Sequence, residues 1–158
     1  YTHWQRTFLH PMLLAFDAPS REECTAQRSV SNTPKAALTL LNDPTFVEAA
    51  RVLAATVVAG QAQQDESTAD AARVEQLFQQ VLARRPLDEE TAVLIELLQA
   101  NRSHYRKAPE EAAKLLTVGD ADAAAGPDAA ADLAAAEVAA WTAVARTLLN
   151  LHETITRE

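Results

Sequence analysis

Cysteine is nearly absent from this sequence, and its scarcity limits the chemistry that the chain can carry. The 158 residues contain one cysteine, Cys24, so no disulfide can form within the chain. Covalent attachment of a c-type haem needs Cys-x-x-Cys-His, a pattern that a single cysteine cannot complete. The sequence therefore predicts no such haem, and no other cofactor, in this chain. Two predictions remain for Cys24: it is a small buried apolar side chain, or it pairs with a cysteine outside this chain.

Basic residues and long apolar runs are also scarce. Lysine and arginine total 14 against 22 acidic residues, which gives a net charge of −8. An acidic chain without a basic stripe repels a phosphate backbone, so we expect no nucleic-acid partner. The longest apolar run, residues 53–59, is far shorter than the roughly 20 residues that a membrane-spanning helix needs. We therefore expect no membrane span.

Glycine is rare, with three residues, whereas alanine is abundant, and this balance favours helix. Thr33-Pro34 and Asp43-Pro44 are helix start signals, and Gly60 and Pro86 are stop signals. Asp88 is the expected cap of a later helix. Helices are expected at about 34–42, 44–60, 65–83, 88–105 and 109–116, with a last one that follows the alanine tract 119–132.

Apolar residues recur at helical spacing in these segments, and no alternating strand pattern of useful length is present. The expected buried positions include Phe46, Phe78 and Trp141 and the stripe Val93, Leu94, Leu97 and Leu98. Residues 153–158 are expected to form a solvated tail. The predicted fold class is all-α, a single domain over 1–158 with an irregular segment over 1–33 and a bundle of about five or six helices over 34–158.

The stretch FDAPSREECTAQR, residues 16–28, resembles a signature of the Planctomycete-specific domain, an uncharacterised domain of large planctomycete cytochrome c proteins. The resemblance continues through NTP at 32–34 and ALTLLNDPTFVEAAR at 37–51, and it returns in LARRP at 82–86. The C-terminal segments 140–145 and 148–158 are also similar to that family. The resemblance thus extends over nearly the whole chain.

This resemblance implies a parent protein of many hundreds of residues, of which the chain would be a C-terminal piece. The opening Tyr1-Thr2-His3, without an initiator methionine, agrees with that expectation. Similar proteins carry an export signal, c-type haem modules and a second planctomycete-specific domain upstream. The resemblance therefore implies a periplasmic or cell-surface location, upstream domains of the parent as partners, and haem elsewhere in the parent. The resemblance also implies an association with polysaccharide breakdown.

The densest polar cluster lies in the irregular segment, and we treat it as a candidate binding loop made of Asp17, Arg21, Glu23, Cys24, Arg28 and Asn32, with Glu22 beside them. The two arginines are suited to gripping a carboxylate or an acidic sugar. Asp17 and Glu23 are candidates for the carboxylate pair of glycoside chemistry. The alternative, which we favour, is a network of ion pairs that pins a long irregular segment.

Other chemistry finds little support in the residues. His3, His10, His104 and His152 are candidate axial ligands for a neighbouring haem, but surface or capping roles are more ordinary for isolated histidines. No metal-ligand spacing, P-loop, dinucleotide fingerprint or Gly-x-Ser-x-Gly motif occurs. The leading hypothesis is a non-catalytic structural and interaction module. Two alternative hypotheses remain. In the first, the chain forms part of a carbohydrate-binding or polysaccharide-active site that an upstream domain completes. In the second, the chain is an acidic docking module for electron transfer.

Overall fold

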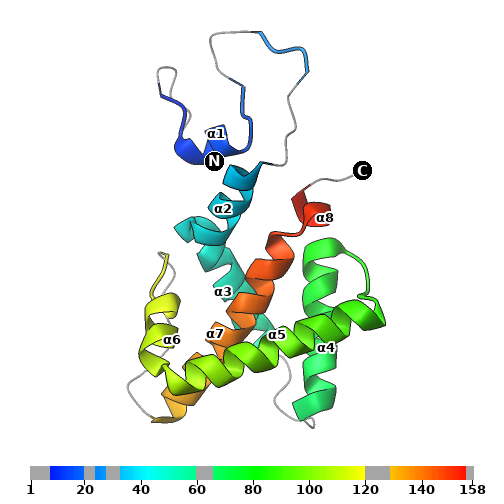
Figure 1. The fold of residues 1–158 in the computed structure, drawn as a ribbon, viewed down its shortest axis with the longest axis vertical. Helices are drawn as coiled ribbons and strands as arrows, with labels where there is room; N and C mark the ends of the chain where they lie inside the picture. The colour runs from blue at the N-terminus through cyan, green and yellow to red at the C-terminus, as the bar shows by residue number, and fades with distance from the viewer. Residues whose placement is uncertain (1–7, 20–23, 28–32, 60–65, 120–128, 156–158) are drawn as a thin grey trace.

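The computed structural model describes residues 8–19, 24–27, 33–59, 66–119 and 129–155. In these ranges the chain forms eight α-helices and no strand (Figure 1). The prediction of an all-α fold is thereby confirmed. The helices are α1 (Pro11–Ala15), α2 (Pro34–Asn42), α3 (Pro44–Ala59), α4 (Glu66–Leu82), α5 (Asp88–Lys107), α6 (Pro109–Leu116), α7 (Ala129–Leu149) and α8 (His152–Ile155).

Local signals set most of the helix starts. Pro34 follows Thr33, whose hydroxyl accepts a hydrogen bond from the Ala36 amide at 3.2 Å. Asp43 ends α2 and starts α3, because its carboxylate accepts from the Thr45 amide at 3.0 Å. The expected cap of α5 was wrong by one residue: Leu87 occupies the cap position and Asp88 is the first helical residue.

Two short helices raise the number above the five or six expected. In α1, which falls in the segment expected to be irregular, Pro11 stands at the first position and His10 Nδ1 accepts from the Met12 amide at 3.3 Å. At the other end, α8 forms within the segment expected to be a solvated tail. Thr154 ties it back, since its hydroxyl donates to the Leu148 carbonyl oxygen at 2.6 Å.

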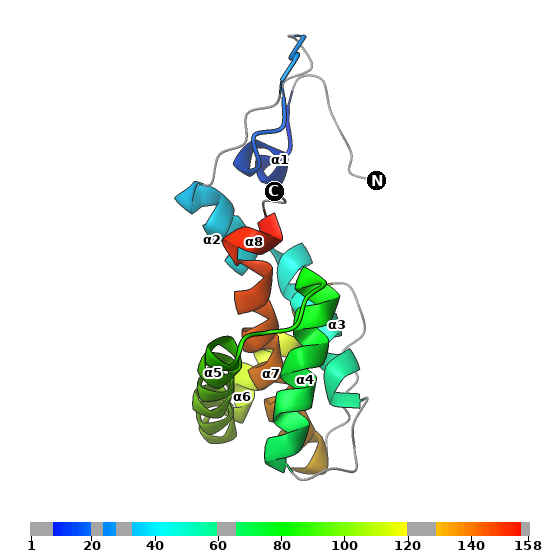
Figure 2. The same cartoon turned by 90° about the vertical axis from the view of Figure 1, so that its right-hand side faces the viewer.

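The core is built around α7, which packs mainly against α3 and α5 and also contacts α4 and α6. Figures 1 and 2 show α7 running through the middle of the molecule, with α3, α4, α5 and α6 around it. Its alanines allow close approach, and Trp141 is fully buried. The central cluster joins Ala50, Ala54 and Val57 of α3, Val74, Leu77 and Phe78 of α4, Leu94 and Leu98 of α5, and Ala140, Trp141, Val144, Ala145 and Leu148 of α7.

A buried ionic cluster crosses this core. Arg102 of α5 donates to both carboxylate oxygens of Asp70 of α4, at 2.5 and 2.7 Å, and to both oxygens of Glu137 of α7, at 2.8 and 2.5 Å. Trp141 Nε1 donates to Glu137 at 2.9 Å. Burial alone would raise the pKa of Glu137, but the hydrogen bonds and charge of Arg102 outweigh burial and leave that pKa below its ordinary value. One guanidinium thus fixes α4, α5 and α7 relative to one another.

Candidate functional site

The polar loop predicted from sequence lies largely outside the described residues, namely at Arg21, Glu22, Glu23, Arg28 and Asn32. Two of its members are described. Asp17 follows α1 with a φ of 52°, in the left-handed region, and is half-buried. Cys24 is an exposed free thiol, so the reading of this residue as a buried apolar side chain was wrong. The binding role of this loop stays a prediction.

His10 and His104 have local roles. His10 caps α1. His104 Nε2 lies 2.8 Å from Glu111 Oε2 on the exposed side of α5 and α6. Across the described part of the chain, no three histidine, cysteine or acidic side chains gather as metal ligands would, and no helix is both long and apolar enough to cross a membrane.

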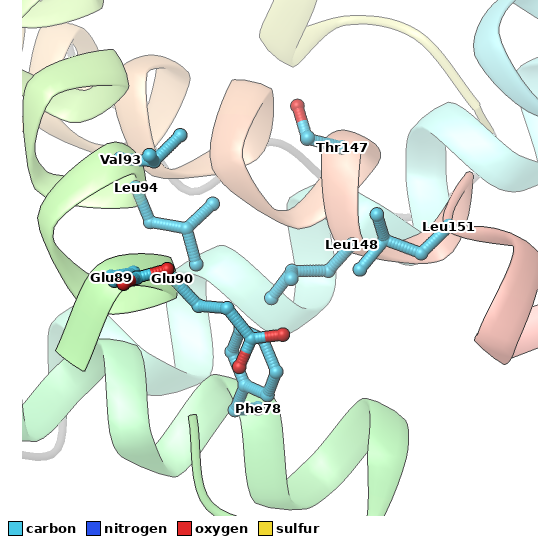
Figure 3. A pocket seen from close by; sticks show the side chains of 8 residues that line it. All are labelled: Phe78, Glu89, Glu90, Val93, Leu94, Thr147, Leu148 and Leu151. Carbon is cyan, nitrogen blue, oxygen red and sulfur yellow. The ribbon is translucent and has the colours of Figure 1, made fainter. Parts of the chain in front are cut away.

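An open apolar cavity lies where α4, α5 and α7 meet the start of α8, and we name it the α5 cavity (Figure 3). Its volume is about 290 Å³. In Figure 3, Leu94 of α5, Leu148 of α7 and Phe78 of α4 converge on the hollow. The lining residues are Phe78, Glu89, Glu90, Val93, Leu94, Thr147, Leu148 and Leu151.

The walls and the rim of the α5 cavity differ in burial. Phe78 and Leu148 are each 1% exposed and belong to the core, so the floor is rigidly packed. Val93 was expected in the buried stripe but is 65% exposed. It stands at the edge of the α5 apolar stripe, where the described chain places no helix over it, so the prediction for this residue was wrong. The apolar side chain of Val93 therefore lies exposed at the mouth of the α5 cavity.

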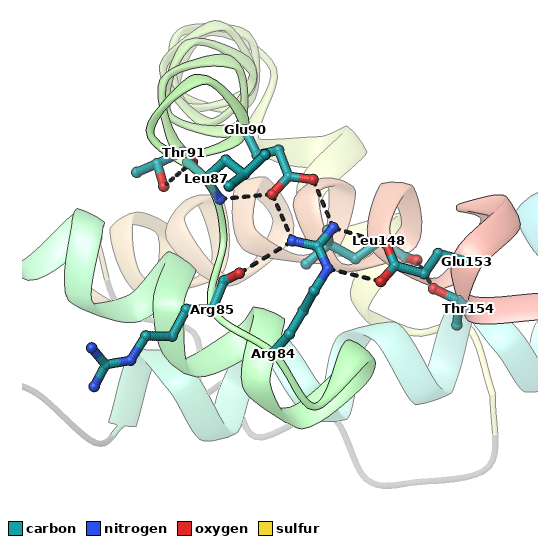
Figure 4. A network of polar contacts seen from close by, with 8 residues as sticks. All are labelled: Arg84, Arg85, Leu87, Glu90, Thr91, Leu148, Glu153 and Thr154. Atoms are coloured by element: carbon teal, nitrogen blue, oxygen red, sulfur yellow. Dashed lines mark hydrogen bonds and ion pairs between the residues drawn. The ribbon is translucent and has the colours of Figure 1, made fainter. Parts of the chain in front are cut away.

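Beside this cavity, Arg84 joins three parts of the chain through Glu90 and Glu153, and we name these three residues the Arg84 cluster (Figure 4). Arg84 Nη1 and Nη2 donate to the two oxygens of Glu90 at 2.8 and 2.7 Å. Arg84 Nε and Nη2 donate to the two oxygens of Glu153 at 2.7 and 2.8 Å. The planar guanidinium is therefore used by two bidentate pairs, one to α5 and one to α8.

The backbone just before Arg84 directs its side chain. Ala83, with a φ of 57°, ends α4 in the left-handed conformation that usually belongs to glycine at this position. The chain turns there, and the Arg84 guanidinium carbon lies 5.0 Å from the centre of the Phe78 ring. Phe78 thus serves as both the floor of the cavity and the platform under the cluster.

The electrostatics follow from this geometry. The hydrogen bonds from Arg84, with a further one from the Leu87 amide at 2.7 Å, lower the pKa of Glu90 to about 2. The same guanidinium lowers the pKa of Glu153, and the two carboxylates raise that of Arg84. All three groups are therefore charged at neutral pH. None of them is poised to exchange a proton there, which argues against an acid–base role for the cluster.

A second hollow of about 360 Å³ lies where α2 and α3 meet the end of α7 and α8, and it is lined by Phe16, Leu40, Phe46, Leu149, Thr154 and Ile155. Phe16 and Phe46 meet edge to face there, with ring centres 5.8 Å apart. Phe46, expected in the core, is only partly buried.

Sequence reasoning missed both the α5 cavity and the Arg84 cluster. Glu153 was assigned to a solvated tail, which was wrong, because it pairs with Arg84. One signal was present for the buried cluster. Asp70 lies four residues before Val74, and Arg102 lies four residues after Leu98. A charge on an apolar helical stripe predicts a partner on another helix.

The fold and the site together define a class, an all-α domain with an open apolar cavity beside a charged inter-helix cluster. The chain belongs to the PSD1 family, described as proteins of unknown function (DUF1553), whose model matches residues 1–98. Neither a curated protein nor a solved structure matches the chain. The matched region includes Phe78, Arg84, Glu90 and Val93, whereas α7 and α8 lie beyond it.

Proposed function

We propose that this chain is a non-catalytic helical module that packs against other domains of a larger planctomycete-type protein, at its C-terminal end. The parent would be exported to the periplasm or cell surface and would carry c-type haem in upstream domains. Membership of the PSD1 family and the resemblance described above support this proposal. The carbohydrate and electron-transfer alternatives have no comparable feature among the described residues.

The observation that carries the proposal is the open, apolar α5 cavity with Val93 exposed at its mouth. Leu151 and Leu94 also line this hollow. Apolar side chains that surround an open hollow are typical of surfaces that another protein segment covers. Glu90 and Glu153 are held in fixed pairs by Arg84, which suits a docking surface better than a reaction centre.

Site-directed labelling tests whether the cavity is covered in the parent. Cys24→Ser removes the exposed native thiol, and Val93→Cys then places a single thiol at the cavity mouth. We expect a maleimide to react rapidly in the isolated chain and at least about tenfold more slowly in the parent protein. Ala113→Cys on α6 is the control, because the 14 residues of α5 that follow Val93, about 21 Å of helix, separate the cavity mouth from α6. Equal labelling of Val93→Cys in both contexts would refute the packing role.

The parent itself is tested by detecting the native polypeptide with an antibody against this chain. We expect a protein much larger than 17.1 kDa that fractionates with the cell envelope and stains for covalently bound haem. A native product of about 17.1 kDa without haem would contradict the proposal.

A further inference from the structure

The rim of the α5 cavity limits the charge of a partner as well as its shape. Thr147 donates its hydroxyl to the Ala143 carbonyl oxygen at 3.0 Å, and Glu90 is bound by Arg84 and the Leu87 amide. The remaining polar group in the lining is Glu89, which is exposed and has no ion pair with any described residue. A partner that covers this rim must therefore either bring a cation to Glu89 or bury an uncompensated carboxylate.

The size of the cavity limits what enters it. An apolar cavity of about 150 Å³ holds one benzene molecule. At about 290 Å³, with a floor made by Phe78, Leu94 and Leu148, the α5 cavity holds one large aliphatic or aromatic side chain with room for a second group. No polar lining group is left unsatisfied inside, so an apolar group is favoured over a sugar.

We propose that the α5 cavity receives a bulky apolar side chain from a basic amphipathic helix of another domain, with a lysine or arginine of that helix next to Glu89. This inference rests on the proposed packing function and names the chemistry of the partner. A second copy of this chain is the less suitable occupant, because each copy carries a net charge of −8 and two acidic rims would meet. Helix-in-groove binding with spaced apolar anchors and flanking charges is a common recognition mode.

A synthetic peptide serves as the probe. It is a fluorescently labelled helix of about 18 residues with leucines at i, i+3, i+4 and i+7 and lysines elsewhere. Its counterpart keeps the leucines and replaces every lysine by glutamate. We expect fluorescence anisotropy to show binding of the lysine peptide to the whole chain, and at least tenfold weaker binding of the glutamate peptide. Equal binding of the two, or no binding of either, would overturn the proposal.

Matched variants locate the binding. Glu89→Lys should weaken lysine-peptide binding about fivefold. Glu110→Lys makes the same change in charge at an exposed site in the first turn of α6, outside the cavity lining, and it should have less than half of that effect. Thr147→Trp fills the hollow from an exposed position and should abolish binding, whereas Val52→Trp on α3 should not.

The outcomes separate this inference from the packing function. Equal weakening by Glu89→Lys and Glu110→Lys would show binding to the general acidic surface and would overturn the cavity as the site. Shielding of Val93→Cys in the parent, together with failure of the lysine peptide, would keep the packing role and reject the basic helix. Peptide binding without shielding in the parent would reject the packing role, and with it the assigned partner.

Discussion

Two arginines in this protein, Arg102 and Arg84, make the same kind of ionic contact in different surroundings. Each lies between two carboxylates and forms two bidentate pairs, Arg102 with Asp70 and Glu137, and Arg84 with Glu90 and Glu153. The Arg102 side chain is 3% exposed, whereas that of Arg84 is 34% exposed. The charged groups and their hydrogen-bond geometry are therefore nearly the same in the two clusters, which differ mainly in how deeply the arginine is buried.

The comparison teaches that the same contacts have different consequences at different depths. A buried charge that loses its partner is left without water, so each group in the Arg102 cluster depends on the others. Around Arg84, water and salt replace a lost partner at small cost. The buried cluster therefore fixes the helices, whereas the exposed one holds α8 and the cavity rim in place.

The largest expected effect is the loss of Arg102. Arg102→Met should lower the free energy of unfolding by roughly 3 kcal/mol, because Asp70 would remain buried with only its longer contact to Arg73, at 3.6 Å. Urea denaturation followed by circular dichroism measures this change. A loss below about 1 kcal/mol would show that water reaches the cluster.

A triple variant sharpens this result. Asp70→Leu, Arg102→Met and Glu137→Gln together remove the charges as well as the partners, while the glutamine amide oxygen can still accept from Trp141 Nε1, and stability should recover most of the loss caused by Arg102→Met. If the triple variant were as unstable as the single one, the ion pairs themselves, rather than the burial of an unpaired charge, would account for the effect.

Arg84→Met should be less destabilising than Arg102→Met, since Glu90 and Glu153 keep contact with water. The difference between wild type and Arg84→Met should shrink at about 1 M salt, where screening acts within about 3 Å. The difference between wild type and Arg102→Met should change little. Equal salt sensitivity at both sites would contradict the contrast in burial.

The pH dependence of the Arg84 cluster follows from Glu90, whose pKa falls from 4.5 to about 2 on folding. A lowered pKa means that the ionised form stabilises the fold above about pH 4.5, and that this stabilisation is lost as the pH falls toward 2. The stability gap between wild type and Glu90→Gln should therefore be present at pH 7 and should close over that window. A gap that stays constant down to pH 2 would exclude ionisation of Glu90 as its cause.

The smallest expected effect concerns the turn that directs Arg84. Ala83→Gly should raise the free energy of unfolding by roughly 0.5 kcal/mol, because glycine adopts the left-handed conformation without strain and offsets its own entropy cost. Thermal denaturation measures the change, with Ala100→Gly on the exposed middle of α5 as the control, which should be destabilising. A loss of stability in Ala83→Gly would show that the turn is unstrained.

Much of the fold could be predicted because its signals are local. Thr33-Pro34, Asp43-Pro44 and Pro109 marked helix starts that the structure confirms, and Trp141 and Phe78 are buried as expected. The short α1 and α8 were missed, since a helix of one turn has too few residues for an apolar period. Their formation depends on contacts such as the Thr154 hydroxyl on the Leu148 carbonyl.

The site could not be predicted in the same way. Glu153 and Arg84 are 69 residues apart, and no pattern within either segment signals the other. Val93 was placed in the core because a periodic stripe shows which residues share a face, but not where a neighbouring helix ends. The cavity is bounded by side chains of α4, α5 and α7 together, so it is a property of their arrangement.

The sequence by itself determined the class of the fold, the starts of the helices that begin at Pro34, Pro44 and Pro109, and the net acidity, because propensity, capping and charge belong to single residues or to close neighbours in the chain. Only the tertiary structure decided which charges pair, which one is buried, and where an apolar surface is left uncovered. Those properties depend on distances between segments that are far apart in the chain. The strength of an ion pair also depends on how deeply it is buried, and the sequence names the charged residues without showing what surrounds them.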